Sequence, residues 1–137
     1  MPTWYQLADQ RDYAGAVIAY VRENQPATFP EVIDCLKDHL EVRGRKMLEI
    51  ARGFNVALWS DISDELADLF LHLITNGHLY VYPCDPLLYL AVRKEMILPI
   101  VREIPRGPLI EPHWLPCILT ADPLEQMSRV QINPELN

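Results

Sequence analysis

The chain has 137 residues, half of them apolar and 23% charged, which is the composition of one globular domain that needs no metal or disulfide to fold. Its formal charge of −7 argues against a general affinity for nucleic acid, because phosphate binding needs clustered Lys and Arg. The longest apolar runs, such as residues 87–92, are far too short to cross a bilayer. No secretion leader follows Met1, so we expect a cytoplasmic protein that does not enter the membrane.

The cysteines indicate reduced thiols. Cys35, Cys84 and Cys117 are odd in number and widely spaced, whereas a disulfide framework needs an even count. Each has a histidine nearby in the sequence, namely His39, His78 and His113. Two such pairs could hold zinc, but structural zinc sites usually show tight Cys-x-x-Cys knuckles, which this sequence lacks. We therefore predict free thiols in a reducing compartment, with no metal and no cofactor.

Two helices are predicted in the N-terminal third of the chain. Apolar residues recur at helical spacing across residues 12–24, and residues 25–27 end that helix at a proline. The second helix begins at Thr28, a suitable N-cap, with Pro30 in the first turn and Glu31 reaching back as in a capping box. Its buried face is predicted to comprise Phe29, Val32, Ile33, Leu36 and Leu40.

The middle of the chain predicts two more helices. After Gly44, apolar spacing favours a short helix that Gly53 would end, with Met47, Ile50, Ala51 and Phe54 on its buried face. A cap signal at residues 60–63 then opens the strongest amphipathic pattern in the chain, which stops at Asn76 and Gly77. Its apolar face is predicted to comprise Ile62, Leu66, Leu69, Phe70 and Leu73.

From His78 the apolar residues alternate, which predicts a half-buried strand over residues 79–82. Residues 83–86 are a turn candidate, and two interpretations of the next segment stay open. Residues 87–92 are favoured as the returning strand of a hairpin, because Tyr82 and Tyr89 would suit cross-strand packing. The alternative is a helix through Met96 that Asp85 caps and Pro86 opens.

The remaining chain is rich in proline, which forbids a long helix. Large apolar residues stay frequent there, so we expect an extended strap packed against the helical body. The residues predicted to be buried are Trp114, Leu115, Ile118 and Leu119. Asp122 and Pro123 could start one last short helix. These patterns divide the chain into a helical domain, residues 1–98, and a C-terminal extension, residues 99–137, packed on the same domain.

The order of helices, glycine, strand, turn and strand resembles the winged-helix branch of helix-turn-helix domains. Three stretches carry the resemblance, 16–24, 26–38 and 64–92, which together make about half of the chain. The last helix and first wing strand would include Leu69, Leu73, Gly77, Leu79 and Tyr80. Residues 41–59 depart from the pattern, in which a short turn separates the second and third helices. The resemblance implies a mainly α, winged-helix-like fold with a small antiparallel β-hairpin and a C-terminal proline-rich extension.

No motif of enzymatic chemistry is present. The sequence lacks a nucleophile elbow, a phosphate loop, a His-Glu-x-x-His motif and a dinucleotide glycine pattern. Four carboxylates do cluster, namely Asp61, Asp64, Glu65 and Asp68. They fall at the start of a predicted helix, where the macrodipole and solvent favour acids. We therefore do not expect an enzyme.

The charged residues help to decide between protein binding and nucleic-acid binding. Six basic residues are the candidate contacts with nucleic acid or a protein partner: Arg43, Arg45, Lys46, Arg52, Arg93 and Lys94. Acidic residues are interspersed among them, as on an ordinary solvated surface. In winged-helix proteins that read DNA, the helix before the wing enters the major groove. In this chain that helix is the acidic one that follows residues 60–63, and the DNA phosphates would repel it. We favour a non-catalytic protein-binding module, an adaptor, regulator or complex subunit; the alternative is a DNA-binding transcriptional regulator. Self-association is left open.

Overall fold

The computed structural model describes residues 1–92 and 94–133, and its fold is mixed. Of the chain, 33% is helical and 20% is strand, in one sheet of three strands and another of two. The expectation of a mainly α fold with one small hairpin is therefore wrong. The described elements are α1 (Trp4–Asp9), α2 (Tyr13–Asn24), α3 (Phe29–Leu36), β1 (Arg43–Glu49), β2 (Val56–Ile62), α4 (Asp64–Thr75), β3 (Tyr80–Pro83), α5 (Leu87–Ala91), β4 (His113–Trp114) and β5 (Cys117–Thr120).

Local capping signals account for α3 and α4. At the start of α3, Glu31 Oε1 accepts the Thr28 N–H at 3.0 Å, which is one half of the predicted capping box. At the start of α4, Ser63 Oγ accepts the Leu66 N–H at 3.1 Å. The helices predicted at residues 12–24, after Thr28 and after residues 60–63 are all confirmed.

A short helix that the apolar pattern does not predict, α1, precedes them. Thr3 and Gln6 form a capping box at its start, in which Gln6 Oε1 accepts the Thr3 N–H at 2.9 Å. Trp4 then packs edge-on against Tyr20 of α2, with ring centroids 5.6 Å apart. An aromatic contact between neighbouring helices therefore holds the N-terminus on the body.

Residues 43–62 form an antiparallel hairpin of β1 and β2, where the sequence predicts a short helix. Gly53 and Asn55 lie in the turn with φ of +83° and +61°, a conformation that glycine and asparagine adopt most readily. The glycine that looks like a helix stop therefore serves a strand turn, and the short-helix prediction is wrong. β4 pairs in parallel with the far side of β2, joining Ala57 to Trp114 across the sheet.

The predicted hairpin between residues 79–82 and 87–92 is also wrong. β3 is a strand as predicted, but it pairs antiparallel with β5, with Tyr80 opposite Thr120. Residues 87–91 form α5, which is the helical alternative in shortened form. The Leu87 N–H donates to Asp85 Oδ1 at 3.0 Å, but the N-cap residue is Pro86, so the capping role that this alternative gives to Asp85 is wrong. Without a returning strand there is no wing.

The C-terminal strap is part of the core. Trp114, Leu115 and Leu119 are at most 1% exposed and Ile118 is 9% exposed, which confirms their predicted burial. The strap is more regular than expected, because it supplies a strand to each sheet. The short helix predicted at Asp122 is not present. Beyond β5, the Val130 N–H donates to Val81 O and the Asn133 N–H donates to Ile50 O, so the tail ties the two sheets together.

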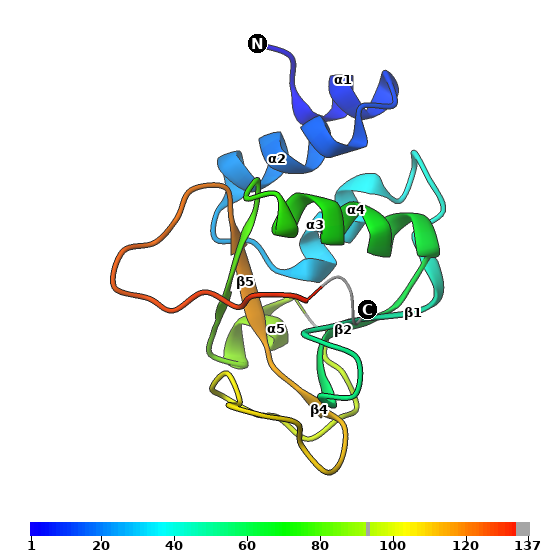
Figure 1. Ribbon diagram of the computed structural model, residues 1–137. Helices are drawn as coiled ribbons and strands as arrows, with labels where there is room; N and C mark the ends of the chain where they lie inside the picture. Colours follow the sequence, from blue (N-terminus) through cyan, green and yellow to red (C-terminus); the bar gives the residue numbers. More distant parts are fainter. Residues whose placement is uncertain (93, 134–137) are drawn as a thin grey trace.

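Figure 1 shows α1 to α4 in the upper half of the view and α5, β4 and residues 94–112 in the lower half, with β5 running between them. Aromatic packing fills the upper core, where Phe29 of α3 meets Phe70 of α4 with ring centroids 5.1 Å apart. A second aromatic cluster lies beside α5. Within the described residues, no helix is both long and apolar enough to cross a bilayer.

Candidate functional site

Two of the six predicted contact residues, Arg43 and Lys94, line one surface groove of about 540 Å³. Three separate parts of the chain form this groove: α3, the β1–β2 hairpin, and residues 94–98. Lys37 at the end of α3 adds a third cation to its lining. Folding thus joins residues from three distant stretches of sequence.

The walls of the groove are apolar. Ile33 of α3, Met47 of β1 and Trp59 of β2 face Met96 and the two residues after it. The side chain of Met47 is 39% exposed and residue 97, an isoleucine, is fully exposed. The sequence pattern places Met47 on the buried face of a helix. It therefore does not predict that Met47 is an exposed part of the groove wall. Exposed apolar side chains inside a groove are typical of a site that a partner covers.

The rim of the groove carries both signs of charge in equal number: Asp34, Lys37, Arg43, Asp61, Lys94 and Glu95. Lys37 Nζ and Asp34 Oδ1 pair at 3.7 Å. No ion pair within the described residues involves the other four. Two cations and two anions therefore stay available to a bound partner. An apolar centre within a polar rim is the usual arrangement of a protein–protein interface.

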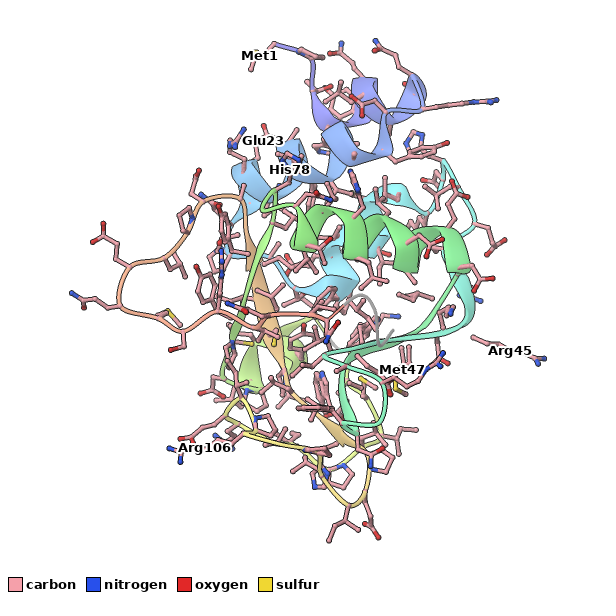
Figure 2. All side chains as sticks on the ribbon, in the orientation of Figure 1. Met1, Glu23, Arg45, Met47, His78 and Arg106 are labelled. Atoms are coloured by element: carbon pink, nitrogen blue, oxygen red, sulfur yellow. The ribbon has the colours of Figure 1, made fainter. Side chains whose placement is uncertain are left out.

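Arg45 and Lys46 lie on β1 but do not line the groove. The strand bulges here, since Arg43 and Lys46 both pair with Ile62 of β2. Arg45 lies within the bulge, and its side chain projects away from the body of the molecule in Figure 2. A bulged, positively charged edge guards a sheet against pairing with another strand. We therefore assign Arg45 and Lys46 no part in the groove.

The last two predicted contact residues are Arg52 and Arg93. Arg52 lies in the β1–β2 turn and does not line the groove; its charge acts on Glu49. Burial raises the pKa of Glu49, and the positive charge of Arg52 opposes that rise. Arg93 lies outside the described residues. In the structure Arg52 therefore lies apart from the groove that Arg43 and Lys94 line, and its charge acts on Glu49 of the same chain.

Trp59 connects the groove to an aromatic cluster beneath it. Its ring centroid lies 5.5 Å from that of Tyr89 and 6.0 Å from that of Trp114. Tyr89 and Trp114 meet edge to face at 4.9 Å. The Tyr89 hydroxyl donates to Cys117 O at 2.7 Å, while the Trp114 Nε1–H lacks a hydrogen-bond partner in the described part of the chain. The cluster fixes α5 against both sheets.

The outer side of α5 is made of leucines. Tyr89 is fully buried, whereas Leu87, Leu88 and Leu90 are 64%, 43% and 53% exposed. At 100° per residue, Tyr89 lies opposite the arc that these three side chains occupy. We call Leu87, Leu88 and Leu90 the leucine face. A solvent-facing helix side normally carries charge, so an apolar one indicates an interface.

The cysteines form no reactive centre. All three are free, as predicted. Burial raises the pKa of the Cys35 and Cys84 thiols to about 12, and that of Cys117 well above its ordinary value. These thiols stay protonated near neutral pH, so they are poor nucleophiles. His39 is close to Asp9, with 3.4 Å between Nδ1 and Oδ1, and no three metal-ligating side chains converge within residues 1–92 and 94–133.

Alkaline solution should destabilise the domain. Burial raises the pKa of Cys35 from 9.0 to about 12, so the folded state holds this proton more tightly than the unfolded state. That contribution is complete below about pH 9 and is lost as the pH rises through the folded value. We expect the urea midpoint to fall from about pH 9 upward, and to fall less steeply in Cys35→Ala. Equal slopes in the two proteins would contradict this assignment.

Comparisons of the chain with known protein families, curated proteins and solved structures found no match. They therefore lend no support to the winged-helix resemblance. Two surfaces of the described structure expose apolar side chains together: the groove with its charged rim, and the leucine face of α5. Both are apolar, and Trp59 and Tyr89 are in contact between them.

Proposed function

We propose that this protein is a non-catalytic protein-binding module whose groove holds a short segment of a partner protein. The observation that carries the proposal is the apolar wall, with exposed Met47 and Ile97 and half-buried Trp59, inside a rim on which Arg43, Asp61, Lys94 and Glu95 form no ion pair among the described residues. An apolar anchor of the segment would cover this wall. A basic and an acidic residue on either side of that anchor would pair with Asp61 or Glu95 and with Arg43 or Lys94.

The balance of charge at the groove favours a protein segment over nucleic acid. A phosphate backbone needs a surface with an excess of cations, whereas this rim has as many anions as cations. The exposed start of α4 is acidic as well, through Asp64, Glu65 and Asp68. Duplex DNA would therefore meet repulsion close to any contact made by Arg43. The free thiols agree with a reducing compartment, and we place the module in the cytoplasm as part of this proposal.

A peptide library tests the groove directly. Random peptides displayed on phage would be selected on the full chain, and the enriched sequences synthesised and titrated by fluorescence polarisation. We expect dissociation constants of about 1–100 µM, because a single groove buries a small area. The selected peptides should carry an apolar residue flanked by both signs of charge. Met47→Glu should weaken binding at least tenfold, since a charge replaces an apolar wall.

Met127→Glu is the matched control, because Met127 is 47% exposed on the tail after β5, away from the groove lining. It should bind the peptides as the wild type does. Peptides whose binding ignores Met47→Glu would overturn the proposal. So would tight binding to duplex DNA with a steep negative salt dependence that Arg43→Ala and Lys94→Ala abolish, since that result would favour the nucleic-acid alternative.

A further inference from the structure

We infer that the leucine face of α5 is the docking site of a second copy of this chain, which gives a two-fold symmetric dimer. The inference goes beyond the proposed function, because it concerns α5; of the residues that it uses, Lys94 also lines the groove, whereas the three leucines do not. Leu87 and Leu90 expose more than half of their surface, although one turn of helix could have placed charged residues there. Covering such a leucine removes apolar surface from water, which favours association.

The leucines cannot turn inward to hide. Tyr89 occupies the inner side of the same short helix, with its ring against Trp59 and Trp114. Its hydroxyl is hydrogen-bonded to Cys117 O at 2.7 Å, and burial raises its pKa well above 10.0. Rotation of α5 would bury the leucines only by breaking this bond and exposing the tyrosine. The leucine face is therefore a fixed property of the fold.

Charge identifies the occupant as a second copy. The chain carries a net charge of −7, so two copies repel each other wherever acidic residues meet. Residues 87–91, Leu-Leu-Tyr-Leu-Ala, carry no charge at all. The leucine face is thus a place where the contacting side chains themselves add nothing to that repulsion. A two-fold interface uses the same patch on both copies, and an uncharged apolar patch is complementary to itself.

The charges at the two ends of α5 also favour a second copy as the occupant. The exposed Asp85 lies just before the helix, and the exposed Lys94 follows it, with its N–H donating to Tyr89 O at 3.1 Å. When two copies of α5 pack antiparallel about a two-fold axis, the start of one helix meets the end of the other. Asp85 of each copy then faces Lys94 of its mate. Opposite charges at the ends of an uncharged helix therefore favour the antiparallel arrangement.

The interface should be modest in size. A stable dimer usually buries about 800 Å² on each partner, more than three leucines supply. We therefore expect a dissociation constant of about 10–100 µM, measurable at the concentrations used for scattering and sedimentation.

Sedimentation equilibrium of the full chain from about 1 to about 300 µM tests the inference. The wild type should move from monomer to dimer over that range. Leu87→Glu and Leu90→Glu should each weaken association at least tenfold, since a carboxylate would be buried at the two-fold axis. Leu124→Glu is the matched control, because Leu124 is 36% exposed on the tail and should leave the dimer unchanged.

Circular dichroism of each variant checks that the fold is retained, which is expected at exposed positions. A wild-type chain that stays monomeric at the highest concentration would overturn the inference. A dimer that forms equally well in Leu87→Glu and Leu90→Glu would also overturn it, because the contact would then lie elsewhere. Neither result bears on Met47 and the groove, so the inference and the proposed function can fail separately.

Discussion

A chain that ends at Pro105 is expected not to fold. The truncation removes β4 and β5, and with them Trp114, Leu115 and Leu119, which are at most 1% exposed. β3 would lose the strand that pairs with it, and β2 would lose its parallel neighbour. Each large buried side chain stabilises by roughly 1.5–3 kcal/mol, while a whole domain is stable by only about 5–15 kcal/mol. Far-UV circular dichroism should show no cooperative thermal transition.

Two longer chains make this result interpretable. A chain ending at Asn133 keeps every described residue and is the reference for the shorter chains. A chain ending at Ala121 keeps both strands but loses Val130 and Ile132, which are 2% and 8% exposed, and the tail contacts with both sheets. It should fold with a midpoint lower by about 4 °C for each kcal/mol lost. Cooperative melting of the Pro105 chain near the full-length midpoint would show that the strap is dispensable.

The sequence predicts three helices well because their signals are local. The capping box of Thr28 and Glu31, and the cap at Ser63, each act within one turn of helix. The apolar stripe of α4 continues without interruption to Gly77, whose φ of +74° suits a helix end. Such signals need no knowledge of distant residues. The existence of these three helices could therefore be predicted from the residues alone. Their bounds could not, because Leu40 lies beyond the end of α3 and Ile62 ends β2 before α4 begins.

The strands are harder to predict, because their partners lie far away. β2 joins β4 across more than fifty residues, and β3 joins β5 across almost forty. Nothing at Tyr82 indicates that its partner is Ile118 and not a residue of the next segment. At Pro86 two local patterns compete, and the preference for a returning strand is wrong because β3 pairs with the distant β5. Before Gly53 the helical spacing is wrong for another reason, since β1 and β2 pair with each other as a hairpin.

The candidate site can be predicted only in part. Arg43 and Lys94 stand out by their charge, and the structure places both in one groove. Their apolar neighbours cannot be predicted, because Met47 and Trp59 become neighbours only through the hairpin. The leucine face can be found only by choosing helix over strand for residues 87–91, since a strand would turn alternate leucines into the core.

Replacing Tyr89 is expected to destabilise the domain strongly. Tyr89→Ala removes a fully buried ring from between Trp59 and Trp114, which should cost about 3–5 kcal/mol. Tyr89→Phe keeps the ring and removes the hydroxyl that donates to Cys117 O, which should cost about 1–3 kcal/mol because a buried acceptor loses its partner. Urea unfolding monitored by tryptophan fluorescence gives both values. A midpoint unchanged in Tyr89→Ala would show that the aromatic cluster does not support α5.

The same two variants distinguish the effect of stability on association from the effect of the direction in which the leucines face. Tyr89→Phe keeps the ring against Trp59, so Leu87 and Leu90 should still face outward and the chain should still associate. Tyr89→Ala leaves α5 without its inner anchor, and a leucine can then turn into the vacated space. Association should therefore weaken in Tyr89→Ala and persist in Tyr89→Phe, even though both variants are less stable. Equal loss of association in the two variants would mean that it follows overall stability, and that the direction in which the leucines face does not control it.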